Sequence, residues 1–253
     1  MLTLNHSNYQ ESSKVINYNI VKQDFENALH ELNLLLGAQY VKSDLDERLH
    51  YSRSTLSTGT LPSAIVKPLC RLEVESIVKI ANQYNLNVHP ISTGKNWGYS
   101  DACALLQGQL LIDLSRMNKI LEVNEKLGYI TIEPGVTQGQ VYDYLQKNKI
   151  KLWMDATGAG PNTSIIGNTM ERGFGHSPHG DRFAHSCGYE VVLPTGEVLN
   201  TGFGHYENSK VTEVYKWGVG PAIDGLFTQS NFGIITKMTM WLMPAPEAFQ
   251  VVA

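Results

Sequence analysis

Apolar residues recur at helical spacing in three stretches: residues 14–37, residues 72–84, and the segment that follows Thr137 and ends near Lys147. In each stretch the apolar side chains return every three or four residues, which places them on one face of a helix. Thr137 is of a type that caps helix N-termini, and Gly37 is of the type that follows a helix C-terminus. The pattern therefore predicts three amphipathic helices.

Short apolar runs of strand type lie between and after these helices. Residues 64–68 precede the second helix and residues 87–91 follow it, so the three segments predict a βαβ unit with parallel strands. The remaining predicted strands are residues 110–114, 120–123, 129–133, 189–193, 198–201 and a last strand that ends at Leu242. Few helices among many short strands predict an α+β fold.

The length of 253 residues allows one large domain or two small lobes. We expect two lobes with a preceding segment. The predicted parts are an N-terminal helical segment and lead-in over residues 1–59, a first subdomain over 60–95 and a second subdomain over 96–253.

Composition narrows the classes of partner. Hydrophobic residues make up 42% of the sequence and charged residues 17%, which is typical of a globular chain. The formal net charge is −4 and no basic stripe is present, so no nucleic-acid partner is expected. No apolar run approaches the roughly 20 residues of a membrane-spanning helix, so no membrane partner is expected either.

The cysteines and the N-terminus bear on the compartment. Cys70, Cys103 and Cys187 are odd in number and scattered, which fits free thiols in a reducing compartment and gives no metal-binding spacing. The first residues lack the charged and apolar regions of a secretory signal. We therefore expect a cytoplasmic protein.

A polar, glycine-rich loop follows the predicted strand 87–91, at residues 92–100. Gly94 and Gly98 can adopt positive φ and let a ligand approach the main chain closely. Successive main-chain N–H groups in such a loop form a nest for anionic oxygens. An ordinary surface loop has the same composition, so both interpretations stay open. The loop matches neither a Walker A motif nor the glycine fingerprint of dinucleotide-binding folds.

A second glycine-rich stretch covers residues 155–175. Ser164 or Thr163 is expected to cap a short helix that ends near Glu171. A helix N-terminus carries partial positive charge and free N–H groups, which favours phosphate. A capped helix that ends at a glycine explains the same residues without a ligand. Together, the two loops favour an extended polar ligand that is held mostly by the backbone.

Other chemistry is less well supported. The histidines His176, His179, His185 and His205 do not form a pattern such as H-E-x-x-H, so no metal site is expected and local hydrogen bonds are the expected role. No G-x-S-x-G nucleophile elbow occurs, which argues against a serine hydrolase.

The motifs, taken in order, resemble those of the vanillyl-alcohol oxidase and para-cresol methylhydroxylase flavoproteins. The matching segments are residues 90–99, 132–137, 164–173, 180–181, 190–193 and 225–236. This resemblance extends over about residues 60–250. It implies an α+β FAD-binding fold of two subdomains with FAD between them, bound without a covalent link.

The resemblance also implies which residues contact FAD, with the pyrophosphate held by the main chain of residues 92–96. The implied contact residues are Ser92, Thr93, Gly94, Lys95, Asn96, Trp97, Pro134, Gly135, Ser164, Gly167, Asn168, Gly173 and Ile235. Trp97 is expected to cover a planar part of the ligand.

The activity implied by the resemblance is oxidation of a phenolic or benzylic alcohol, a small-molecule substrate, by hydride transfer to the flavin. In the family a substrate-binding cap domain follows the segment that ends here at Ala253, so we expect the cap or an electron-transfer protein to come from a partner chain. Gly158 stands where oxidase relatives carry an acidic residue, and Asp155 is left as a candidate catalytic residue. The alternative is a capless flavin-binding module or split-gene subunit with little activity of its own.

Overall fold

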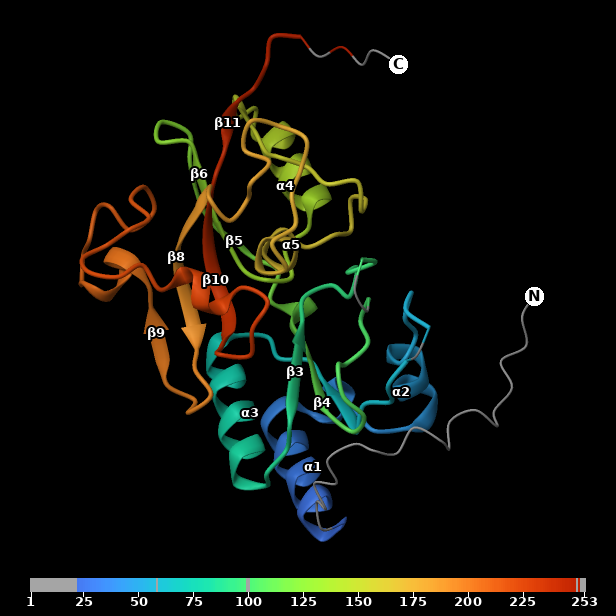
Figure 1. Cartoon of the computed structure of the whole chain (residues 1–253). Helices are drawn as coiled ribbons and strands as arrows, with labels where there is room; N and C mark the ends of the chain where they lie inside the picture. The colour runs from blue at the N-terminus through green and yellow to red at the C-terminus, as the bar shows by residue number, and fades with distance from the viewer. Residues whose placement is uncertain (1–21, 58, 99–100, 249, 251–253) are drawn as a thin grey trace.

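The computed structural model describes residues 22–57, 59–98, 101–248 and 250. Two sheets, each with its own helices, form the two main parts of the molecule, and Figure 1 shows them one above the other. The predicted α+β fold class is confirmed. The predicted helix over residues 14–37 is observed from Lys22 onward, and residues 14–21 lie outside the described residues.

The first sheet has the strand order β1-β2-β4-β3. Its strands are β1 (Val41–Lys42), β2 (Ala64–Val66), β4 (Leu110–Asp113) and β3 (Val88–Ile91). The predicted parallel strands β2 and β3 both run parallel to β4, which lies between them, and β1 is antiparallel to β2.

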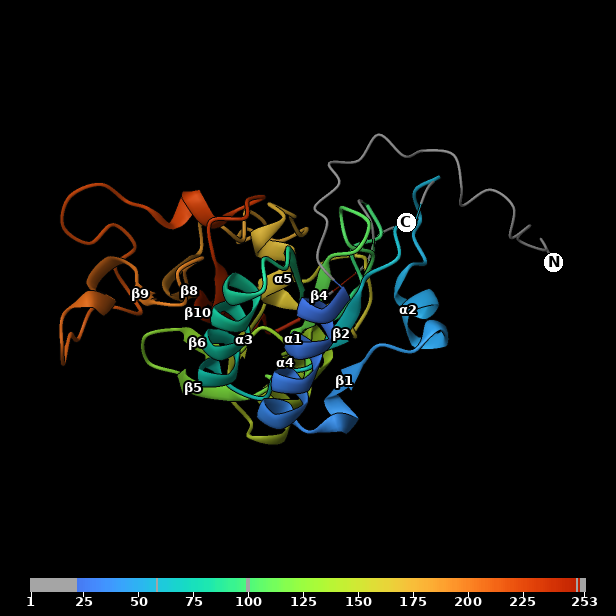
Figure 2. The same cartoon turned by 90° about the horizontal axis from the view of Figure 1, so that it is seen from below.

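Helices cover both faces of this sheet. The helices α1 (Lys22–Leu36) and α3 (Arg71–Gln83) pack on one face, against Val66 and Ile112. The helix α2 (Leu45–Tyr51) packs on the other face, where Tyr51 lies with Ile65 and Leu111. Alternate strand residues therefore point into different layers, as the pleat of a strand requires. Figure 2 shows α1 and α3 side by side.

The second sheet is antiparallel, with the order β5-β6-β10-β8-β9. Its strands are β5 (Ile120–Asn124), β6 (Tyr129–Ile132), β10 (Ile234–Trp241), β8 (Ser186–Val192) and β9 (Val198–Asn200). The helices α4 (Gln138–Lys147) and α5 (Ile165–Met170) contribute apolar side chains to the core over this sheet. A two-stranded pair joins β7 (Leu152–Trp153) to β11 (Met243–Pro244), and the short 3₁₀ helices are η2 (Ala38–Tyr40), η3 (Leu114–Arg116), η4 (Gly202–His205) and η5 (Asp224–Phe227).

Local signals explain where the helices begin and end. The Thr137 hydroxyl accepts a hydrogen bond from the Gln140 main chain, so Thr137 caps α4 as predicted. The Gln140 side chain also accepts a hydrogen bond from the Thr137 main chain, which completes a capping box. Ser164 rather than Thr163 caps α5. Gly37 follows α1 with a φ of 89°, a left-handed conformation that favours glycine.

The boundary between the two parts differs from the predicted division at residues 95 and 96. The strand β4 lies inside the first sheet, and α1 and β1 pack into the same core. Pairing between strands that are distant in sequence decides this boundary, and the apolar pattern does not predict which strands pair. The first core also includes Val192 and Ile234, so the ends of β8 and β10 join the two parts.

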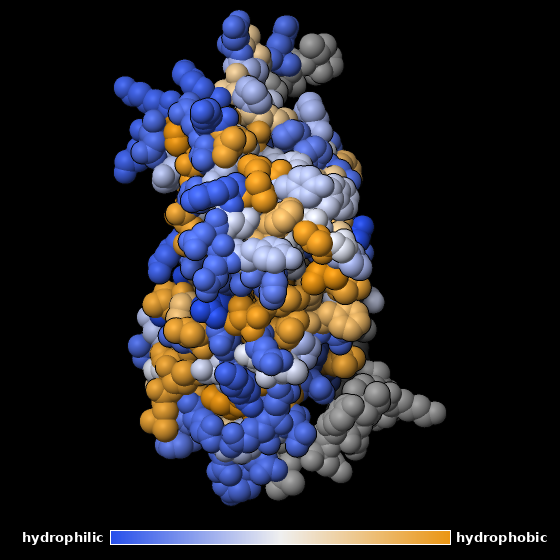
Figure 3. Space-filling model, turned by 90° about the vertical axis from the view of Figure 1, so that its left-hand side faces the viewer, coloured by the Kyte–Doolittle hydropathy of each residue, from blue (hydrophilic) through white to orange (hydrophobic). Residues whose placement is uncertain are grey.

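The surface mixes apolar and polar side chains. Figure 3 shows this mixture on the face that carries β9 and the segment after it, where the side chains of Tyr215, Trp217 and Val219 are exposed. Within the part of the chain that the structure describes, no helix is both long and apolar enough to cross a membrane.

Candidate functional site

The first glycine-rich loop begins where the edge strand β3 ends, at Ile91. Gly94 has a φ of 64°, and a Cβ there would lie 2.7 Å from the Cβ of Ala102, so a side chain at this position would be both strained and crowded. Lys95 and Trp97 are exposed. The loop therefore presents a tight backbone turn to the rest of the site. Tyr99 and Ser100 lie outside the described residues.

The structure brings the first loop against the helix α5, so the two glycine-rich stretches lie close enough to contact one ligand. The main-chain N–H of Ser164 donates to the Thr93 hydroxyl at 3.1 Å. A Cβ on Gly167 would collide with the hydroxyl of Ser92, so a larger residue here would force the Ser92 side chain to move. Residues 92 and 93 thus meet residues 164 and 167 in one place.

A second contact joins the same two segments. The side chain of Asn96 hydrogen-bonds the carboxyl group of Glu171, which follows α5. Burial raises the pKa of Glu171, and the hydrogen bond from Asn96 partly opposes this rise. The contact holds the far end of the loop near the C-terminus of the helix.

The turn at Pro134 and Gly135 lies directly beside the N-cap of α5. The Ser164 hydroxyl donates to the Pro134 carbonyl at 2.6 Å and accepts from the Gly167 main chain at 2.9 Å. A Cβ on Gly135 would lie 2.6–2.9 Å from the carbonyl oxygens of the η3 segment, which again requires glycine. Because α5 has only six residues, its dipole is small, and individual N–H groups matter more than the helix as a whole.

Asn168 provides a direct test of whether these residues fit a hydrogen-bonding ligand. Its side-chain oxygen is buried and has no hydrogen-bond partner among the described residues, whereas most buried polar groups in proteins are paired. A Cβ on Gly173 would collide with the Asn168 amide, so the main chain approaches this side chain closely. An unpaired acceptor beside close-packed glycines fits a ligand with donor groups, such as FAD.

Ile235 stands apart from the other predicted residues. It lies in the central strand β10, and its side chain is buried in the second core. A ligand contact at this position would come from the main chain.

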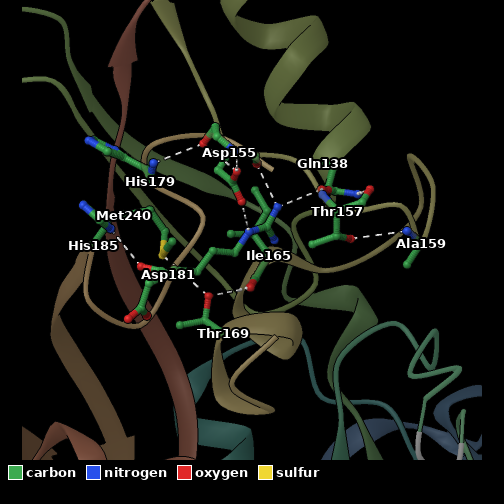
Figure 4. A network of polar contacts seen from close by, with 12 residues as sticks. Gln138, Asp155, Thr157, Ala159, Ile165, Thr169, His179, Asp181, His185 and Met240 are labelled. Atoms are coloured by element: carbon green, nitrogen blue, oxygen red, sulfur yellow. Dashed lines mark hydrogen bonds and ion pairs between the residues drawn. The ribbon is translucent and has the colours of Figure 1, made fainter. Parts of the chain in front are cut away.

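Asp155 lies in a buried polar network, shown in Figure 4. One carboxylate oxygen pairs with the Arg182 Nε at 3.0 Å. The other oxygen accepts from the Ser177 main chain at 3.1 Å and from the Ser177 hydroxyl at 2.6 Å. A carboxylate with both oxygens engaged is poorly placed to accept a substrate proton. The geometry therefore favours a structural role for Asp155 over the catalytic role considered for it.

The histidines nearby make local contacts. The rings of His179 and His185 stack at 4.1 Å between centroids, and their Nδ1 atoms face the carbonyl oxygens of Trp241 and Asp181. Burial lowers the pKa of His179. Among the described residues, no group of three or more His, Cys, Asp or Glu side chains is placed to hold a metal ion.

Two residues of this network, Gln138 and Arg182, were not predicted from the sequence. Gln138 is the first residue of α4, and its side chain is directed toward the loop at Thr157 rather than to solvent (Figure 4). Arg182 directly follows the matching segment at residues 180–181, and its partners lie 27 and 44 residues away. The only sequence signal for Gln138 and Arg182 was that both lie beside predicted motifs, and this position does not indicate which residues they bind.

Comparison with known proteins places this chain in a family. The model of the FAD binding domain family matches residues 62–202, more than half of the chain. The chain therefore belongs to the FAD-binding domain family, and FAD is its cofactor.

Three relatives illustrate the similarity. The chain is 43% identical to 1'-carboxy-chondrochloren decarboxylase of Chondromyces crocatus, over 90% of this chain and 42% of that protein. It is 37% identical to the flavoprotein subunit of 4-cresol dehydrogenase (hydroxylating) of Pseudomonas putida, over 95% and 47%. The crystal structure of p-cresol methylhydroxylase with substrate bound superposes with a TM-score of 0.89 at 38% identity, over 91% and 45%.

These matches confirm the resemblance to the para-cresol methylhydroxylase flavoproteins. The chain spans less than half the length of each of these three relatives.

Proposed function

We propose that the two glycine-rich segments hold FAD without a covalent bond. The contact that carries the proposal is the meeting of Ser92 and Thr93 with Ser164 and Gly167, since it forms one backbone-lined site from two distant segments. The pyrophosphate would lie against the main chain of residues 92–96. Pro134, Gly135, Asn168, Gly173 and Ile235 would complete the contacts, and Trp97 would cover a planar part of the ligand.

This chain's residues would act by position and hydrogen bonding. Main-chain N–H groups of the first loop would neutralise phosphate oxygens without clustered lysines or arginines. Glycines at 94, 135 and 167 let the protein segments around the site approach one another closely, and the free Asn168 oxygen would accept a hydrogen bond from the ligand. When bound, FAD supplies hydride acceptance from a substrate.

The reaction that we propose for the whole protein is oxidation of a phenolic or benzylic alcohol-type substrate. Support comes from the name of the Pseudomonas relative, 4-cresol dehydrogenase, at 37% identity. That relative is a flavoprotein subunit, which supports a partner for this chain: an electron-transfer protein, or a chain that carries a substrate-binding cap. The chain alone, as a flavin-binding module or split-gene subunit, would show little activity.

A second candidate is flavin-dependent decarboxylation, favoured by the 43% identity to a protein named as a decarboxylase. Turnover assays with 4-cresol and with carboxylated phenolic compounds separate the two. Carbon dioxide release without an added electron acceptor would favour decarboxylation, and acceptor reduction with 4-cresol would favour oxidation.

We also propose that the protein works in the cytoplasm. The three cysteines are free thiols, and two of them, Cys103 and Cys187, are buried, which fits a reducing compartment. Cell fractionation with a reducing-compartment marker tests this location.

The visible spectrum of the purified protein tests the cofactor assignment. We expect flavin absorption bands, or their appearance with protein after incubation with FAD and gel filtration. Acid precipitation should then release the colour into the supernatant. Failure to take up FAD would contradict the proposed site, and colour retained in the pellet would show a covalent link instead.

A further inference from the structure

Arg182 is the most deeply buried charged side chain near the candidate site. It is 1% exposed, and its Nε pairs with Asp155 at 3.0 Å. Its Nη2 donates to the Asp155 carbonyl at 2.8 Å and to the Gln138 side-chain oxygen at 2.9 Å. Burial of a guanidinium is costly, and such groups are well held only when several acceptors surround them. Arg182 therefore fixes Asp155 and Gln138 relative to each other.

Gln138 passes this constraint to the loop at residues 157–163. Its side-chain oxygen accepts from the Thr157 main chain at 2.7 Å, and its side-chain nitrogen donates to the Gly160 carbonyl at 2.9 Å. Its own main-chain N–H donates to the Thr163 carbonyl at 3.0 Å. One buried residue thus holds the beginning, middle and end of the loop.

The loop leads directly into the candidate cofactor site. Thr163 is followed by Ser164, which caps α5, donates to the Pro134 carbonyl and contacts Thr93 of the first loop. A change in the course of the loop would therefore move the atoms that join the two glycine-rich segments. Small misplacements of positioning groups have large effects on ligand binding and chemistry.

We propose that Arg182 and Gln138 are positioning residues of the cofactor site: they fix the loop at residues 157–163 and, through it, the place of Ser164 against Thr93. This role rests on the proposed function, in which these segments hold FAD. Neither side chain needs to contact the ligand. The remaining amino group of Arg182, Nη1, has no hydrogen-bond partner among the described residues, and Arg182 is one of the residues that line a cavity of about 10 Å³, room for about one water molecule.

The first test compares Gln138→Leu with Lys216→Met in the full chain. Lys216 is a matched control because it is also buried and also donates to two main-chain carbonyls, those of Phe183 and Ser186, but not to the loop. We expect Gln138→Leu to weaken FAD binding at least about tenfold, the equivalent of about one lost hydrogen bond. Lys216→Met should change FAD affinity less than about threefold, even where it lowers the melting temperature as much.

The second test separates positioning from simple stabilisation. Arg182→Lys keeps a positive charge for Asp155 but cannot bridge to Gln138 with the same planar geometry. It should therefore recover most of the stability that Arg182→Met loses but little of the FAD affinity. Hydrogen–deuterium exchange should show faster exchange at residues 157–163 in both Arg182 variants and in Gln138→Leu, and unchanged exchange in β2 and β4.

The outcomes are distinguishable. Wild-type FAD affinity and slow loop exchange in Gln138→Leu would overturn the positioning role. The role would also be overturned if Lys216→Met lost as much FAD affinity as Gln138→Leu for the same drop in melting temperature. If the wild-type chain itself takes up no FAD, the proposed function fails. Exchange at residues 157–163 then still decides whether Arg182 and Gln138 hold the loop.

Discussion

The two glycine-rich segments of the candidate site are held in place in different ways. The first, residues 92–97, follows the edge strand β3, is half-buried or exposed, and makes its polar contacts largely with the opposite segment and neighbouring loops. The second, residues 155–175, is held by a buried network that is centred on Arg182 and lies over the second core. The second segment is thus held by buried contacts within the protein, whereas the first has fewer of them; under the proposed function, FAD would supply the remaining contacts of the first segment.

This difference has a practical meaning for binding. A pre-organised half loses little conformational entropy when a ligand arrives, and a half with few contacts loses more. Changes in the second segment should therefore affect the stability of the protein itself, and changes in the first should be felt mainly when the cofactor binds.

The largest expected effect comes from Asp155→Ala. The substitution leaves the buried Arg182 guanidinium without its carboxylate, and loss of one partner from a buried ion pair costs about 3–5 kcal/mol. Urea unfolding followed by circular dichroism measures this loss. Asp143→Ala, at an exposed position of α4, is the control and should stay within about 0.5 kcal/mol of wild type. A small effect at Asp155 would mean that the second segment is not held by this network.

A smaller loss is expected when the two segments are forced apart. Gly167→Ala places a Cβ against the Ser92 hydroxyl, and such overpacking costs about 1–3 kcal/mol. FAD titration should show strongly weakened binding, because the added methyl group pushes Ser92 away from α5 at the site itself. Gly158→Ala is the matched control, since no atom lies within 4 Å of a Cβ built there. Equal FAD affinity in the two variants would contradict the close approach.

Thr93→Val tests the first segment with a change of similar shape. It removes the hydroxyl that accepts from the Ser164 main chain, and the lost hydrogen bond is worth about 1 kcal/mol. We expect a small loss of stability in the free protein and a clearer loss of FAD affinity. Thr55→Val, which removes a hydroxyl that donates to the Trp97 carbonyl, is the comparison on the outer side of the same loop. A larger effect from Thr55→Val would place the important contact elsewhere.

The smallest effect concerns pH. Burial lowers the pKa of His89 in β3 and of His179, which follows the second segment, below the ordinary value of 6.5. The unfolded chain therefore binds more protons than the folded chain in the window below pH 6.5, so stability is full above that window and falls as the pH drops through it. Unfolding curves measured at several pH values should show a weaker dependence of stability on pH in His89→Gln and in His179→Gln than in the wild type. The exposed His30 supplies the control substitution, and unchanged curves in the first two variants would refute the assignment.

Sequence reasoning succeeded where the signal is local. The helices that begin after Thr137 and Ser164 were predicted from their capping residues, because a cap acts within three residues of itself. The two glycine-rich segments were also identified from their own composition. The structure brings these two segments into contact through Thr93 and Ser164. The FAD contacts themselves stay a prediction.

Sequence reasoning failed where partners are distant. The insertion of β4 between β2 and β3 depends on strand pairing that no local pattern encodes. Arg182 shows the same limit, since its acceptors lie on two other segments and a lone arginine in a loop is usually solvated. Asp155 was identified from the sequence as a candidate, but its ion pair with Arg182, 27 residues away, could not be foreseen from local sequence.

The central place of β10 in the second sheet bears on how the protein is made. This strand covers residues 234–241, yet it pairs with both β6 and β8, which precede it in the chain. During synthesis the sheet therefore lacks its middle strand until residue 241 has left the ribosome, and such long-range pairing folds slowly. Cofactor loading would then follow translation rather than accompany it. A chain truncated before residue 234 should fail to unfold cooperatively, which a urea titration would show.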